Sequence, residues 1–60
     1  MKFLIKSLFF TTQEDIEFTN ENPPGWLIHK EYRWFFEKNV LTLEVGQSVD
    51  TDFNTITRIS

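Results

Sequence analysis

Hydrophobic and polar residues alternate over much of the chain, with the period of two that is typical of β-strands. The clearest case is the segment 2–11. Every second residue from Phe3 to Phe9 is uncharged and lies on one side, whereas Lys2 and Lys6 lie on the other. This pattern predicts a first strand over residues 2–11, with the uncharged side facing the core.

A second short strand and a strong break follow. Residues 12–15 are polar and predict a turn, after which residues 16–18 can form the second strand of a hairpin. Pro24 followed by Gly25 supplies the fixed φ and the positive φ that a type II turn requires. A new element is therefore expected after Gly25.

Residues 26–37 fit two structures, and the fold class depends on which of them forms. As a strand, the segment has five apolar or aromatic side chains of six on one side and two of six on the other. As a helix, it has an apolar stripe through Ile28, Tyr32 and Phe36, but aromatic residues have poor helix propensity and Trp34 lies off the stripe. We favour the strand, with a helix at about 24–38 as the alternative.

The C-terminal third predicts further strands. Residues 40–45 alternate, and Gly46 begins a reversal. Residues 48–59 alternate again, with a slip in phase at Asn54 that predicts a bend or bulge. The prediction is an all-β fold, a small, strongly bent antiparallel sheet or a partly closed barrel of about five strands. The alternative for residues 24–38 predicts an α+β fold, one helix packed on an antiparallel sheet.

Composition favours β structure and dense packing in a single domain over residues 1–60. The chain has no alanine, seven threonines, five isoleucines and ten aromatic residues, and β-branched and aromatic side chains suit a pleated sheet. A chain of this size buries only roughly 60% of its unfolded surface. Because there is no cysteine to form a disulfide, aromatic packing is the reinforcement that the composition offers.

The absence of cysteine and of long apolar runs predicts a soluble, cytoplasmic protein. Small secreted domains usually depend on disulfides, which this chain lacks. No apolar run reaches the roughly 7 to 15 residues of a signal-peptide core or the roughly 20 residues of a membrane span. We therefore expect no membrane partner.

The sequence contains no recognisable catalytic or metal-binding motif. Asp50, Asp52 and Asn54 have the spacing that opens a calcium-binding loop, but Thr55 stands where that loop requires glycine. His29 is the only histidine, whereas acid–base and metal chemistry normally recruit several suitable groups. We expect no enzymatic activity, no metal and no cofactor.

Surplus apolar residues and an uneven distribution of charge indicate a binding surface instead. If the uncharged side of the first strand faces inward, Leu4, Leu8 and Phe10 on its other side face outward and form an apolar patch. The net charge is −3, and no Lys or Arg stands between Ser7 and His29. The candidate partner-binding residues are the exposed apolar side chains and the acids of that base-free stretch: Leu4, Leu8, Phe10, Trp34, Phe35, Glu14, Asp15, Glu17 and Glu21.

These features favour a non-enzymatic protein-interaction module, a small regulator or inhibitor that binds a larger protein through an aromatic patch flanked by acidic loops. Viral and mobile-element genomes encode many such proteins. One alternative is a small barrel that stacks single-stranded nucleic acid on its aromatic residues beside Lys30, Arg33 and Lys38, although the acidic segments repel phosphate. Another is a homo-oligomer, such as a homodimer, that covers the apolar surplus.

Overall fold

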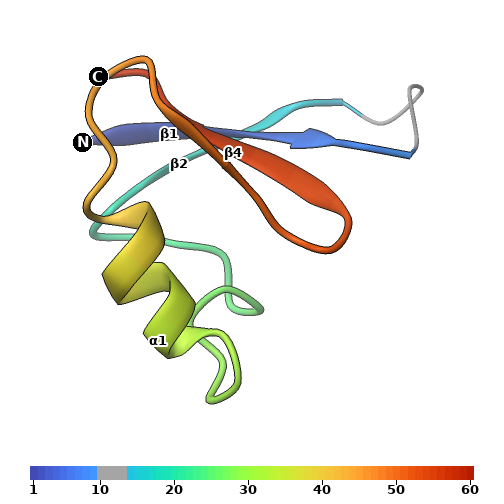
Figure 1. The fold of residues 1–60 in the computed structure, drawn as a ribbon, viewed down its shortest axis with the longest axis vertical. Helices are drawn as coiled ribbons and strands as arrows, with labels where there is room; N and C mark the ends of the chain where they lie inside the picture. Colours follow the sequence, from blue (N-terminus) through green and yellow to red (C-terminus); the bar gives the residue numbers. More distant parts are fainter. Residues whose placement is uncertain (10–13) are drawn as a thin grey trace.

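The computed structural model describes residues 1–9 and 14–60, which form one antiparallel sheet with a helix on one side (Figure 1). The strands are, in chain order, β1 Lys2–Ser7, β2 Ile16–Thr19, β3 Ser48–Asp50 and β4 Asn54–Arg58. Between β2 and β3, the α-helical turn α1 (Arg33–Phe35) continues directly into the π-helical turn η1 (Phe36–Val40). The two turns form one helical segment.

The strand order in the sheet is β2-β1-β4-β3, and every neighbouring pair is antiparallel. The first and last strands, β1 and β4, are therefore central, while β2 and β3 form the edges. The helical segment connects one edge to the other and lies below the sheet in Figure 1. The predicted small antiparallel sheet is confirmed. It has four strands and is not closed into a barrel.

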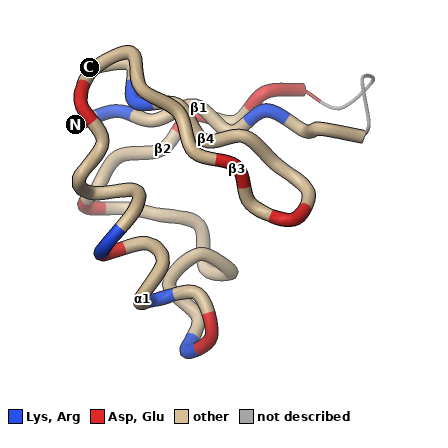
Figure 2. The backbone as a smooth tube through the Cα atoms, in the orientation of Figure 1, with Lys and Arg blue, Asp and Glu red and all other residues tan. Residues whose placement is uncertain are grey.

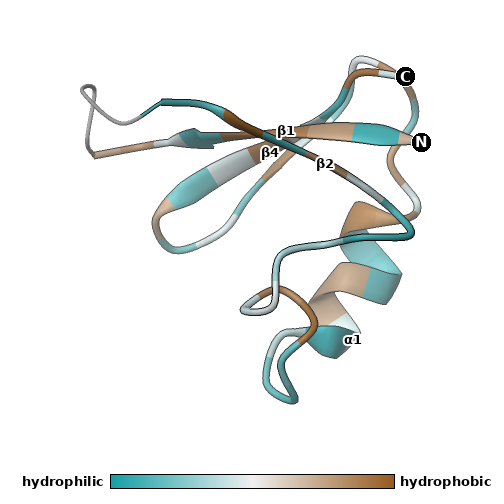
Figure 3. Ribbon diagram, turned by 180° about the vertical axis from the view of Figure 1, so that it is seen from behind, coloured by the Kyte–Doolittle hydropathy of each residue, from teal (hydrophilic) through white to brown (hydrophobic). Residues whose placement is uncertain are grey.

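The register of the strands determines which residues face the helix. Phe3 lies opposite Phe18 on β2, and Ile5 lies opposite Ile56 on β4. Because residues opposite each other share a face of the sheet, these four side chains lie together on the helix side. In β1 the hydrophobic residues Phe3–Ile5 lie between Lys2 and Lys6, and Figure 3 shows this brown stretch between hydrophilic ones. The predicted inward side of β1 is therefore correct for the part of the strand that the helix covers.

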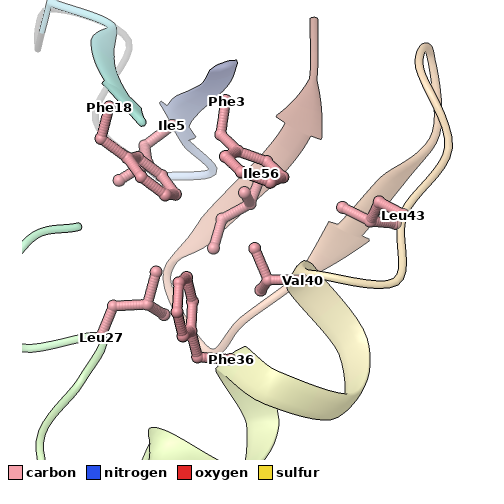
Figure 4. Packing of buried hydrophobic residues seen from close by; sticks show 8 residues of the cluster. All are labelled: Phe3, Ile5, Phe18, Leu27, Phe36, Val40, Leu43 and Ile56. Atoms are coloured by element: carbon pink, nitrogen blue, oxygen red, sulfur yellow. The ribbon is translucent and has the colours of Figure 1, made fainter. Parts of the chain in front are cut away.

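The core lies between this face and the helical segment (Figure 4). The Phe3 and Phe18 rings stack with their centroids 5.0 Å apart and their planes 18° apart. The buried residues come from all parts of the chain: Phe3, Ile5, Phe18, Leu27, Phe36, Val40, Leu43 and Ile56. None of the described polar or charged residues is buried, so the core contains no charge that requires a partner.

The strand predicted over residues 26–37 is wrong. Turns fill the segment as far as Tyr32, and the helix begins at Arg33, so the α+β alternative gives the correct type of element. A strand would bury Trp34, but this side chain is 67% exposed, whereas Phe36 and Val40 are buried. Residues i and i+4 share one side of a helix, so one helical segment places both residues on the sheet.

The strand predicted over residues 40–45 is also wrong. Leu43 N donates to Val40 O at 3.1 Å, which closes a turn after the helix. Val40 and Leu43 are both buried, although in a strand residues three positions apart face opposite sides. Val45, which a strand would place on the same side as Leu43, is 61% exposed. The predicted reversal at Gly46 is present, since this residue has a φ of +90°, a conformation that glycine adopts without strain.

The slip in phase at Asn54 marks a hairpin, where a bend or bulge was predicted in one long strand. β3 ends at Asp50 and β4 begins at Asn54, and the two strands pair antiparallel. Thr51 N donates to Asn54 O at 2.7 Å and closes the turn. The alternation on the two sides of Asn54 therefore belongs to two strands.

Within residues 1–9 and 14–60, no helix is both long and apolar enough to cross a membrane.

Candidate protein-binding surface

Two aromatic side chains lie exposed at the end of the sheet farthest from the chain termini. Phe9 follows β1 and is 65% exposed, and Phe53 lies in the β3–β4 turn and is 62% exposed. Their ring centroids are 6.1 Å apart with an interplanar angle of 67°. Leu8 is 46% exposed, and its N–H donates to Phe53 O at 2.9 Å. Leu8, Phe9 and Phe53 are called the sheet tip below.

The sheet tip is exposed because the helical segment packs against the end of the sheet nearest the termini and runs away from the strands (Figure 1). Phe36 and Val40 cover the part of the sheet that holds Phe3 and Ile56 (Figure 4). Beyond this region the sheet extends past the helix, on the side away from the two termini (Figure 1). Ile16 lies opposite Ile5 on an edge strand and is still 58% exposed. Apolar side chains therefore continue past the core into solvent.

The turn that carries Phe53 is held by the side chain of Thr51. Its Oγ1 accepts from Asn54 N at 3.0 Å and from Phe53 N at 3.3 Å. The next residue, Asp52, accepts a long hydrogen bond of 3.4 Å from the Tyr32 hydroxyl. The negative charge of Asp52 is the main cause that raises the pKa of Tyr32 above its ordinary value. The turn is thus fixed from within and linked to the start of the helix.

Charge is divided unevenly between the two ends of the molecule. Residues 3–18 and 48–57 carry five acids and one lysine, a net charge of −4, while the basic strand residues Lys2 and Arg58, at the end of the sheet nearest the termini, are counted with the rest of the chain. The rest of the chain carries four acids and five bases, a net charge of +1. Figure 2 shows acidic positions where β2 begins and in the β3–β4 hairpin. The exposed aromatic pair therefore lies at the acidic end.

No arrangement typical of a metal centre accompanies this surface. In the described part of the chain, no three His, Asp or Glu residues are close enough together to hold a metal ion. Asp50 Oδ1 accepts from Thr55 Oγ1 at 2.8 Å, and Asp52 accepts from Tyr32. The two aspartates of the calcium-like spacing thus have separate hydrogen-bond partners.

Comparisons with protein-family models, curated proteins and solved structures find no match to this chain.

The apolar residues predicted as a binding patch do not form one surface. Leu8 belongs to the sheet tip, and Phe10 lies outside the described residues. Leu4 is half-buried on the face of the sheet away from the helix, opposite Glu17. Phe35 is half-buried and packs against the core. Trp34 is 67% exposed on the helix, two residues before the buried Phe36 and thus on nearly the opposite side.

The predicted acidic residues are all exposed, and most lie at the acidic end. Glu14 and Asp15 precede β2, and Glu17 lies on it. Glu21 follows β2, in a turn that Asn22 N closes by donating to Thr19 O at 3.1 Å. The base-free stretch of the sequence therefore marked two acids, Glu14 and Asp15, at the end of the sheet that carries the exposed aromatic pair, a third, Glu17, opposite Leu4, and a fourth at the other end of β2.

Sequence reasoning missed Phe9 and Phe53 as surface residues. Alternation placed Phe9 on the core side of the first strand, but the core ends before Phe9. Phe53 was assigned to a continuous strand, but it occupies a turn. The signal that could have revealed this turn is its composition, because Asp, Thr and Asn side chains around a single aromatic residue favour local hydrogen bonds over a sheet ladder.

Proposed function

We propose that this protein is a non-enzymatic protein-binding module, a small regulator or inhibitor that acts by covering a surface of a larger protein. The observation that carries this proposal is the aromatic pair at the sheet tip, in which Phe9 is 65% and Phe53 62% exposed. Burying the exposed part of each ring would remove about 100 to 150 Å² from water. At about 25 cal/mol per Å², that is about 3 kcal/mol per ring before the costs of association.

The acidic residues near the sheet tip support the same proposal. Charges around an apolar contact increase the rate of encounter and select among partners. A net charge of −4 in residues 3–18 and 48–57 repels nucleic acid phosphates and thus disfavours a single-stranded nucleic acid ligand. The lack of cysteine supports a reducing compartment such as the cytoplasm.

The experiment that tests this function is selection from a displayed library of random peptides. Wild-type protein is compared with Phe53→Ser and Phe9→Ser. Trp34→Ser is the matched control, because Trp34 is as exposed as the two tip residues but lies on the helix. Selected peptides should bind the tip variants at least tenfold more weakly and the control variant unchanged, since a well-buried aromatic anchor contributes about 2 kcal/mol or more.

Circular dichroism of all three variants separates loss of binding from loss of the fold. The three side chains are mostly in solvent, so each variant should unfold within about 0.5 kcal/mol of the wild type. Peptides that depend on Trp34 and tolerate both tip substitutions would move the binding surface to the helix. Failure to select any peptide would refute the proposed binding surface.

A further inference from the structure

We propose that the sheet tip binds a segment that is both basic and apolar, in which Lys or Arg residues flank Leu or Phe side chains. This inference rests on the proposed function and names the class of its partner. It follows from the position of the exposed rings of Phe9 and Phe53 at the end of the molecule that carries a net charge of −4.

The acidic side chains near the tip are available to a cationic partner. Among the described residues, Asp50 accepts a hydrogen bond from the neutral hydroxyl of Thr55 and Asp52 from that of Tyr32, and neither hydroxyl compensates the negative charge. Glu14 and Asp15 are exposed immediately before β2. Among residues 1–9 and 14–60, none of these four carboxylates forms an ion pair.

The only base in this part of the molecule does not neutralise it. Lys6 lies on the outer face of β1, opposite Thr55 of β4, and it is exposed. Pairs of exposed charges interact weakly in water, and five acids face this single base. A segment with several Lys or Arg side chains would gain from all of them at once.

The apolar part of the partner follows from the two rings. Phe9 and Phe53 meet at an interplanar angle of 67°, an edge-to-face arrangement that leaves ring surface open for a third apolar side chain. A purely basic segment would leave these rings in water, and a purely apolar segment would leave the carboxylates unpaired. A segment with both basic and apolar side chains would bury the rings and also pair with the carboxylates.

The same charge disfavours two other occupants. A second copy docked tip to tip would place a net charge of −4 against an equal charge, and like charges across an interface are destabilising. The cytoplasmic surface of a membrane is also negative, so anionic lipid would be repelled. A basic segment of another protein is the occupant that the electrostatics favour.

Three displayed pools of peptides of equal length test this inference. The first contains Lys, Arg, Leu, Phe and Gly, the second replaces the bases with Asp and Glu, and the third replaces Leu and Phe with Ser and Asn. Only the first pool should yield peptides that bind. Their affinity should fall about tenfold between low and high salt, because ions screen charges at a protein surface.

Matched variants locate the charge effect. Removing two charges near the tip with Glu14→Gln and Asp15→Asn should weaken a selected basic peptide about fivefold. Removing two charges away from the tip, with Glu37→Gln on the helix and Glu44→Gln in the loop before β3, should leave its affinity within about twofold. All four side chains are exposed, so the fold should tolerate both pairs, and circular dichroism verifies this.

The outcomes distinguish this inference from the proposed function. Equal enrichment of acidic–apolar peptides that still require Phe53 would overturn the partner class and leave the binding module intact. Equal enrichment of basic–polar peptides would show that charge alone suffices and would also overturn the inference. If no pool yields a peptide that depends on Phe53, both the inference and the proposed function fail.

Discussion

Phe36 and Trp34 offer the sharpest test of how the middle of the chain folds. In a strand both side chains would point to the same side of the sheet, but in the helix they point in nearly opposite directions. Phe36 is 6% exposed and packs in the core, whereas Trp34 is 67% exposed. Truncating each residue to alanine should therefore have very different effects on stability.

The expected difference is several kcal/mol. Phe36→Ala removes a buried ring between the helix and the sheet, a change that costs about 3 to 5 kcal/mol. A domain of 60 residues is stable by only about 3 to 9 kcal/mol, so this variant should be largely unfolded. Trp34→Ala removes a solvent-exposed side chain and should change the free energy of unfolding by less than about 0.5 kcal/mol.

Urea unfolding followed by far-ultraviolet circular dichroism measures both effects. Phe36→Leu keeps the measurement possible if the alanine variant does not fold, and it should cost about 1 kcal/mol, equivalent to a fall in Tm of about 4 to 8 °C. The reasoning would be refuted if Trp34→Ala cost as much as Phe36→Ala, because equal costs are the signature of a strand with both rings buried.

Three further predictions concern the sheet and its turn. Ile56 has no exposed surface, so Ile56→Ala should cost about 2 to 5 kcal/mol and Ile56→Val about 1 kcal/mol in urea unfolding; equal costs would contradict its central place in the core. Thr51→Val removes the hydroxyl that accepts from Asn54 N and should lower the free energy of unfolding by about 1 kcal/mol, and an unchanged urea midpoint would show that this bond contributes nothing. Asp52 raises the pKa of Tyr32, so Asp52→Asn should lower that pKa in an ultraviolet titration of the only tyrosine, and an unchanged titration would contradict the contact. Because the raised pKa favours the neutral phenol in the folded state, its contribution to stability is present below the ordinary tyrosine value near 10 and is lost as pH rises through the folded pKa.

The binding surface was only partly predictable. The base-free stretch located Glu14 and Asp15 at the end of the sheet that carries the exposed rings, because charge distribution can be read without knowing the fold. Alternation assigned Phe9 to the core side of the sheet, since a pattern along one strand does not show where the covering helix ends. The exposure of Phe9 depends on where the helical segment packs on the sheet, which is a property of the whole fold.

The sequence by itself determined the local geometry of the sheet. The alternation in residues 2–7 specified which side of β1 faces the core, and Gly46 specified a reversal through its positive φ. The small antiparallel sheet followed from β-branched and aromatic composition together with closely spaced turns. These features depend on neighbouring residues, which a sequence shows directly.

Only the tertiary structure decided between strand and helix after Gly25. In the observed sheet both sides of β1 are paired, with β2 and β4, so the segment between β2 and β3 has no place beside the central strand. It crosses the apolar face from one edge to the other. A helix with Phe36 and Val40 on one side covers that face, and the gain from burying both residues outweighs the poor helix propensity of the aromatic residues.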